Sequence, residues 1–262
     1  MIRWERDGAV GVALIDRPER RNALNAELCD ELRTHLEQSR DLRAVVVGGA
    51  GDRAFCSGAD LGRRAADLGG GGEGGLEHGG GDTFRPAFEA VLAEIVAFPA
   101  PVIAAVNGAA LGAGMQLAVA CDLRVVAPNA TFGIPAARLG VMISSANVER
   151  LAALVGTAAA RDVLLTARVL DVDDAEQLGL VQRRAPDAVA GARALAGDLA
   201  AFAPLSVSGH KRALSLVAAA STLSDSARAE LADLETAAFA SRDLQEGLAA
   251  FAEKRPPRFE GR

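Results

Sequence analysis

The order of apolar and polar positions at the start of the chain predicts a hairpin followed by a helix. Two β-prone runs, Ile2–Arg6 and Val10–Ile15, flank the dipeptide Asp7-Gly8, and Asp-Gly strongly favours a tight turn between antiparallel strands. Leucine then recurs at every fourth position from Leu28 to Leu36, which is the spacing of one helical face. We therefore expect a helix from about Ala26 to Ser39.

The middle of the chain alternates buried strands with helices. Short apolar runs bounded by turn residues are typical of strands covered on both faces. Three such runs occur, at Ala44–Val47, Val102–Val106 and Leu123–Val126. We expect residues 48–52 to form a turn, a helix to run from about Phe84 until just before Pro99, and a further helix, opened by glycines, to span Leu111–Ala120. This alternation predicts an α/β fold.

The last third of the chain is mostly helical in pattern from about Ser145 onward. Pro204, Asp171 and Ser224 mark possible helix starts. Residues 69–82 read GGGGEGGLEHGGGD, a low-complexity stretch that predicts a flexible loop. The core pattern continues on both sides of this insert, so it is not a domain boundary. We expect residues 1–200 to form the core and residues 201–262 a helical C-terminal region for oligomerisation.

Composition and charge narrow the class of protein. The 262 residues are 50% hydrophobic, enough to bury the core of one large domain. The net charge of −6 argues against nucleic-acid binding, which usually needs a basic surface. No signal peptide is expected, because the N-terminus lacks an apolar segment, and no apolar run is long and unbroken enough to span a membrane. The cysteines form no CxxC pair and favour a reduced, cytoplasmic setting: Cys29, Cys56 and Cys121.

Two glycine-bordered turns are the first candidates for chemistry. The segments FCSGADL, at 55–61, and NGAALGAGMQ, at 107–116, each follow an apolar strand and lead toward a helix. The first N–H groups of a helix have no partner within it, and the helix dipole favours negative charge there. Two such N–H groups that converge would form an oxyanion hole for a thioester carbonyl. Taken singly, each segment is more often an ordinary tight strand-to-helix turn, and the glycines of the second fail the GxGxxG order of a dinucleotide site.

Longer stretches resemble one family. FCSGADL, PVIAAVNGAALGAG and LAVACDLRVVAPNATFG are similar to the signature stretches of the enoyl-CoA hydratase/isomerase (crotonase) superfamily. RPERRNALN resembles the CoA-binding loop of that family, and EGLAAFAEKRPPRF resembles its C-terminal helix and tail. The segments occur in the correct order over nearly the whole chain. The resemblance implies a crotonase-like α/β fold, a spiral of β-β-α units with a helical trimerisation region, and assembly into a trimer or a dimer of trimers.

The resemblance also implies a ligand and the residues that hold it. The ligand is a coenzyme A thioester, with no cofactor or metal. The oxyanion-hole N–H groups fall on Ala59 and Ala113, and Lys254 matches a basic residue near the CoA of a neighbouring subunit. The segments that line the CoA site contribute Arg20, Arg21, Ala23, Leu24, Asp60, Leu61, Gly62 and Gly112. By themselves Arg20, Arg21 and Lys254 would be ordinary surface charges.

The residues that should carry proton transfer depart from the family pattern. Typical hydratases of the family use two glutamates, and the matching positions here are Gln116 and Ala136. A glutamine keeps the shape of glutamate but is not a base near neutral pH, and alanine transfers no proton. The chain therefore resembles a branch of the family that lacks both glutamates.

Few other groups are candidates for the missing chemistry. Other family members place an acid where this chain has Ser144, and a serine needs a base beside it to act as a nucleophile. The alternative for Ser144 is a loop or helix-capping residue. The histidines are expected on a surface helix, in the glycine-rich loop and at the start of a C-terminal helix: His35, His78 and His210. Glu149 is the nearest downstream carboxylate, but Arg150 beside it favours an exposed position.

Two functions therefore remain open. The first is an acyl-CoA-binding protein with little or no hydratase activity. The second is an active enzyme of the same superfamily, a hydratase, isomerase, thioester hydrolase or decarboxylase, that uses other groups around the oxyanion hole. A protein with a purely structural role is the third possibility, and the oxyanion-hole and CoA-binding segments argue against it.

Overall fold

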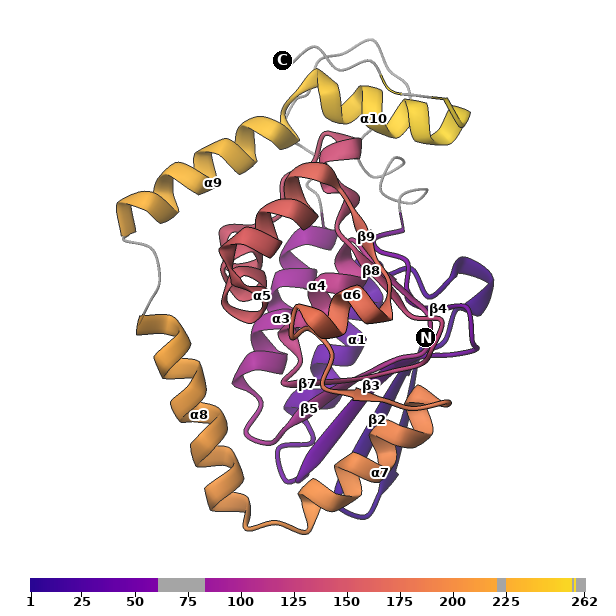
Figure 1. Cartoon of the computed structure of the whole chain (residues 1–262), viewed down its shortest axis with the longest axis vertical. Coiled ribbons are helices and arrows are strands. Elements are labelled where there is room, and N and C mark those ends of the chain that lie inside the picture. The colour runs from indigo at the N-terminus through magenta and orange to yellow at the C-terminus, as the bar shows by residue number, and fades with distance from the viewer. Residues whose placement is uncertain (61–82, 221–224, 256, 258–262) are drawn as a thin grey trace.

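The computed structural model describes residues 1–60, 83–220, 225–255 and 257. Within these residues the strands form two sheets (Figure 1). The six-stranded sheet has the order β1 (Ile2–Asp7), β2 (Val10–Ile15), β3 (Ala44–Gly49), β5 (Val102–Val106), β7 (Leu123–Val126) and β10 (Arg183–Arg184). The four-stranded sheet has the order β4 (Ala54–Cys56), β6 (Ala109–Leu111), β8 (Thr131–Gly133) and β9 (Val169–Leu170).

Helices cover these sheets and continue beyond them. The α-helices are α1 (Ala26–Glu37), α3 (Phe84–Ala97), α4 (Ala113–Ala120), α5 (Ser145–Thr166), α6 (Val172–Gln177), α7 (Ala188–Ala200), α8 (Pro204–Ala220), α9 (Asp225–Phe239) and α10 (Arg242–Glu253). Two 3-10 helices, η1 (Pro18–Arg20) and η2 (Pro135–Leu139), lie in loops. No single helix of the described residues is long and apolar enough to cross a membrane, although α7 and the first part of α8, as a bent pair, pass by length and composition alone.

A repeating β-β-α unit organises the chain, as the family resemblance predicts. In β3–β4, β5–β6 and β7–β8, the first strand of each pair joins the six-stranded sheet and the second joins the four-stranded sheet. The strands that follow one another around the spiral pair in parallel, since β3 pairs with β5, β5 with β7, β4 with β6 and β6 with β8. The crotonase-like α/β fold is therefore confirmed.

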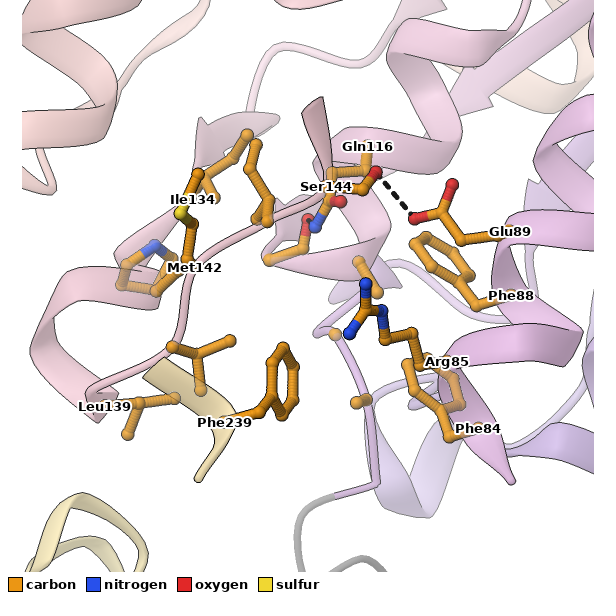
Figure 2. Close-up of a pocket in the computed structure, with 18 of the residues that line it drawn as sticks. Phe84, Arg85, Phe88, Glu89, Gln116, Ile134, Leu139, Met142, Ser144 and Phe239 are labelled. Carbon is orange, nitrogen blue, oxygen red and sulfur yellow. Dashed lines mark hydrogen bonds between the residues drawn. The ribbon is translucent and has the colours of Figure 1, made fainter. Parts of the chain in front are cut away.

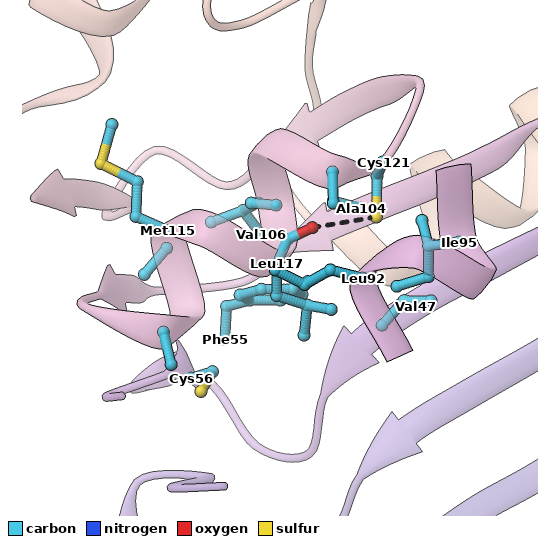
Figure 3. Packing of buried hydrophobic residues seen from close by; sticks show 14 of the residues in the cluster. Val47, Phe55, Cys56, Leu92, Ile95, Ala104, Val106, Met115, Leu117 and Cys121 are labelled. Carbon is cyan, nitrogen blue, oxygen red and sulfur yellow. Dashed lines mark hydrogen bonds between the residues drawn. The ribbon is translucent and has the colours of Figure 1, made fainter. Parts of the chain in front are cut away.

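The core lies on both faces of the six-stranded sheet. On one face, α1, α3 and α4 pack with the second sheet around buried side chains such as Phe55, Leu92 and Met115 (Figure 3). On the other face, α7 covers the sheet through alanines and Leu195, packed against Val46 and Ile103. Strands buried on both faces have to be apolar at nearly every position, which explains their continuous apolar runs.

The structure moves several expected boundaries. The helix expected at Leu111–Ala120 is wrong at its start, because Leu111 ends β6 and α4 begins at Ala113. The intervening Gly112 has φ +56°, a conformation that ends the strand and that glycine adopts without strain. The helix expected to reach Ser39 ends at Glu37, and β3 extends through Gly49 into the expected turn.

The helix-start signals have different outcomes. Pro204 begins α8, and the Asp171 side chain accepts a hydrogen bond from the Asp174 N–H at the start of α6, so both predictions are confirmed. Ser224 and the glycine-rich segment 69–82, with His78, lie outside the described residues. His210 was expected to begin a helix but lies inside α8 instead.

The C-terminal helices α8, α9 and α10 follow one another around the outside of the core (Figure 1). Helix α8 is tied to the core through Lys211, whose Nζ donates to the carbonyls of Ile95 and Ala100 at 3.2 and 3.0 Å and lies 2.7 Å from an Asp122 carboxylate oxygen. Elsewhere α8 is largely exposed, and Leu205 and Leu214 are 87% and 69% accessible. The last helix, α10, packs on η2.

Candidate functional site

The two glycine-bordered turns meet in the structure. A carbon added at Gly58 would lie 3.2 Å from the Leu111 carbonyl oxygen and 3.8 Å from the Ala113 nitrogen. Gly58 and Gly112 both have positive φ, +114° and +56°, so side chains at either position would be strained. Gly114 lies still closer to the first turn, since a carbon added there would stand 2.0 Å from the Cys56 carbonyl oxygen. Glycine is required here so that α4 can begin directly against β4.

Where the turns meet, two backbone N–H groups, those of Ala59 and Ala113, have no backbone partner among the described residues. Ala59 forms a parallel bridge with Leu24, in which the Leu24 N–H donates to Gly58 at 2.8 Å and the Asp60 N–H donates to Leu24 at 2.7 Å. The peptide N–H of the residue between them, Ala59, points to the opposite side of such a ladder. Ala113 is the first residue of α4, and the first N–H groups of a helix have no partner within it. This arrangement can stabilise a negatively charged oxygen.

One cavity of about 140 Å³ opens beside these N–H groups, and all five predicted catalytic positions line it. Its wall includes Ala59, Gly112, Ala113, Gln116, Ala136 and Ser144. Much of the remaining wall is apolar, with Phe84 and Phe88 from α3 on one side, Leu139 and Met142 on the other, and Phe239 from α9 between them (Figure 2). An apolar chain fits this wall. Arg85 from α3 also lines the cavity, and its guanidinium carbon lies 5.1 Å from the centre of the Phe239 ring (Figure 2).

The polar end of the cavity contains a carboxylate, Glu89 of α3. Its Oε1 accepts a hydrogen bond from the Ser144 hydroxyl at 2.8 Å, and Figure 2 shows the two side chains pointing toward one another. The same oxygen accepts a second hydrogen bond, from Asn147 Nδ2, also at 2.8 Å. Ser144 is also the N-cap of α5, which confirms the expectation of a helix-capping residue. Two donors on one oxygen hold the carboxylate in a fixed orientation.

Gln116 belongs to the same hydrogen-bond network. Asn147 Nδ2 donates to Gln116 Oε1 at 2.8 Å, and Gln116 Nε2 donates to the Gly112 carbonyl at 3.2 Å. The orientation of Asn147 is set by Arg150, whose Nη1 donates to Asn147 Oδ1 at 2.6 Å. The Asn147 amide nitrogen therefore faces both Glu89 and Gln116. Burial lowers the pKa of Arg150, and the nearby Glu89 and Glu149 charges oppose this shift.

Several residues of the predicted CoA site form a compact structure around Asp60. Ala23, Leu24 and Asp60 are all buried. Its carboxylate lies 3.0 Å from Arg17 and 3.7 Å from Arg20, and the Arg17 side chain also donates to the Ala23 carbonyl at 2.9 Å. The buried pair therefore fixes the loop, while Arg20 remains mostly exposed beside it.

Two other predicted CoA residues, Arg21 and Lys254, do not line the cavity. Arg21 has φ +50° at the end of η1 and is exposed. Lys254 caps the end of α10, is exposed, and does not line the cavity. Leu61 and Gly62 lie outside the described residues.

Nucleophilic thiol chemistry is not available at this site. Burial raises the pKa of Cys56, which lies in the first turn, and of Cys121 to about 12, and it raises the pKa of Cys29 as well. The thiolate is the reactive form, so all three side chains are inert at neutral pH. Among the described residues, no three His, Cys, Asp or Glu side chains gather as a metal site would require.

Glu89 and Arg17 are the residues that sequence reasoning missed. The signal for Glu89 is weak: it lies at the edge of the apolar face formed by Phe88 and Leu92, where a charged residue on a helix is usually solvated. Glu149 was expected to be exposed but is half-buried. His35 lies at the surface of α1, as expected, and is half-buried because its ring stacks on Trp4 with centroids 4.9 Å apart.

Comparison with known proteins gives the family. The pattern of the family described as Enoyl-CoA hydratase/isomerase matches residues 5–262. A probable enoyl-CoA hydratase echA6 from Mycobacterium leprae is 38% identical over 97% of this chain and 97% of its own length. The crystal structure of carnitinyl-CoA hydratase from Mycobacterium avium is 33% identical, with a TM-score of 0.82 over 100% of this chain and 98% of that one. The chain belongs to the enoyl-CoA hydratase/isomerase family.

Proposed function

We propose that this protein binds an acyl-CoA thioester, with its carbonyl oxygen between the N–H groups of Ala59 and Ala113, and that it has little hydratase activity. The observation that carries the proposal is the meeting of the two turns beside a largely apolar cavity. An acyl chain would lie along the apolar wall, and CoA would extend toward the loop that Asp60 holds. The free, buried thiols support a cytoplasmic location. Low hydratase activity is supported by the uncharged residues Gln116 and Ala136 at the positions of the two glutamates.

The substitution Ala113→Pro tests this placement of the carbonyl. Proline lacks an N–H and is well tolerated at the first position of a helix, where Ala113 stands. A net hydrogen bond contributes ~0.5–1.5 kcal/mol. We therefore expect the affinity for an acyl-CoA thioester, measured by calorimetry, to fall by roughly 2- to 13-fold.

Matched ligands separate this effect from damage to the cavity. Free CoA has no acyl group, and an S-alkyl-CoA thioether of the same chain length has the chain but no carbonyl. Both should bind the Ala113→Pro variant as they bind the unchanged protein. If the thioester and the thioether weaken equally, or if neither weakens, the Ala113 N–H does not bind the carbonyl.

We also propose that the protein assembles into a trimer or a dimer of trimers. The support is the apolar, exposed side of α8, at Leu205 and Leu214, together with the open arrangement of the C-terminal helices (Figure 1). In such an assembly Lys254 would reach the CoA of a neighbouring subunit. Light scattering should give three or six times the 26.9 kDa mass of one chain. A clean monomer would contradict the proposal.

One observation favours a second candidate, an active enzyme of the family. The cavity that would hold the thioester also contains an ionisable group, Glu89, at its polar end. Both hydrogen bonds that described residues donate to this carboxylate end on the same oxygen, Oε1.

A further inference from the structure

Glu89 does not match either of the two glutamate positions of the family, yet it lines the same cavity as the oxyanion-hole N–H groups. We propose that Glu89, from α3, is the proton-transferring carboxylate of this site. The proposal rests on the proposed function, because its substrate is the acyl-CoA thioester held by Ala59 and Ala113. The juxtaposition that carries it is a carboxylate and two oxyanion N–H groups lining one cavity.

The hydrogen bonds around Glu89 suit a base and not only a structural anchor. Both donors, Ser144 Oγ and Asn147 Nδ2, are directed to Oε1 at 2.8 Å. They hold the carboxylate in one orientation, and no side chain in the described part of the protein donates to Oε2, whose lone pairs remain for a third partner. A base held by neighbouring groups is preorganised for proton transfer, because it need not reorient when the substrate arrives.

The glutamine at position 116 has a physical explanation if the charge is at position 89. The Asn147 amide nitrogen donates one hydrogen to Glu89 and the other to Gln116, each at 2.8 Å. A glutamate at 116 would place a second carboxylate on the same amide group, and like charges sharing a site disfavour ionisation of both. A neutral amide at 116 avoids this conflict. The carboxylate that α4 lacks is supplied by α3.

The reaction is a proton transfer at carbon next to the thioester carbonyl. Glu89 Oε2 takes a proton from the α-carbon, so the C–H bond breaks and an O–H bond forms. The electron pair of the C–H bond becomes the carbon–carbon double bond of an enolate, and the carbonyl π electrons move to oxygen, where the N–H groups of Ala59 and Ala113 stabilise the charge. Return of the proton to the same carbon regenerates the substrate, and no other reactant is consumed.

The substitution Glu89→Gln separates the catalytic role from a structural one. Glutamine has nearly the shape of glutamate, and its carbonyl oxygen can accept the same hydrogen bonds from Ser144 and Asn147. A residue that only anchors α5 would be replaced with little effect. A base would be lost, because an amide does not accept a proton near neutral pH.

The experiment follows deuterium uptake from D2O into the acyl group of a saturated acyl-CoA by mass spectrometry, with calorimetry of the same ligand in parallel. The matched control is Glu94→Gln, which also removes a negative charge from α3. Glu94 pairs with Arg40 and does not line the cavity. We expect the unchanged protein and the Glu94→Gln variant to exchange α-protons, and the Glu89→Gln variant to exchange ~10²–10⁴-fold more slowly with its acyl-CoA affinity retained.

Each result decides between the two proposals. Acyl-CoA binding without deuterium uptake by the unchanged protein overturns the role of Glu89 and leaves the binding function intact. Uptake that Glu89→Gln does not slow, or that Glu94→Gln slows equally, also overturns it. Failure of the unchanged protein to bind acyl-CoA overturns both proposals.

Discussion

Hydration of a 2-enoyl-CoA by this protein is expected to be negligible, slower by at least ~10²–10⁴-fold than catalysis with a pair of acid–base groups. Hydration needs water to be deprotonated for attack on the β-carbon and a proton to be delivered to the α-carbon. Gln116 and Ala136 line the cavity and neither can be the base or the acid. Among the described residues that line the cavity Glu89 is the one carboxylate, and one of its oxygens is already occupied, so it serves one proton transfer and not two.

Ultraviolet absorbance of the conjugated enoyl thioester measures this reaction directly and should stay flat at high protein concentration. A kcat of ~1–10³ s⁻¹, the range of ordinary enzymes, would contradict the prediction. The Glu89→Gln variant is the informative comparison for any slow rate, because it shows whether that rate depends on the Glu89 carboxylate. The double substitution Gln116→Glu with Ala136→Glu introduces both family glutamates. Its result is harder to interpret, because the new acid at 116 would share the Asn147 amide with Glu89.

The Gly114→Ala variant is expected to lose both stability and acyl-CoA binding. The added methyl carbon would lie 2.0 Å from the Cys56 carbonyl oxygen, 2.8 Å from the carbonyl carbon and 2.9 Å from Cys56 Cβ. The first two atoms belong to the backbone, so α4 itself has to move away from β4. Overpacking of this kind costs ~1–3 kcal/mol. The movement also separates the N–H groups of Ala59 and Ala113, which must be about 3 Å from one oxygen to act together.

Urea unfolding and calorimetry with an acyl-CoA measure the two effects. Gly197→Ala is the matched control, because Gly197 lies inside α7 and a carbon added there meets no atom within 4 Å. Alanine in a helix interior should raise the free energy of unfolding by ~0.5–1 kcal/mol relative to glycine. A Gly114→Ala protein as stable as the unchanged one, with full acyl-CoA affinity, would show that α4 does not depend on this close approach.

Local patterns predicted most of the fold. Buried strands such as β5 and β7 carry continuous apolar runs because both of their faces are covered, and that pattern depends little on which elements cover them. The start of α4 was placed two residues too early for a specific reason. Leu111 is apolar and could belong to a strand or a helix, and only its pairing with Gly133 in the second sheet decides between them.

The sequence by itself determined the fold family and the two turns, because glycines, small residues and their spacing act over a few neighbouring positions. It also predicted that Gln116, Ala136 and Ser144 would lie near the site, on the strength of family resemblance. The polar network was decided only by the tertiary structure. Glu89 lies 55 residues from Ser144 and 58 from Asn147, and the folded spiral brings α3 against the start of α5. A charged residue at the edge of a helix has the same local pattern whether it faces water or a cavity, so only long-range packing could distinguish the two.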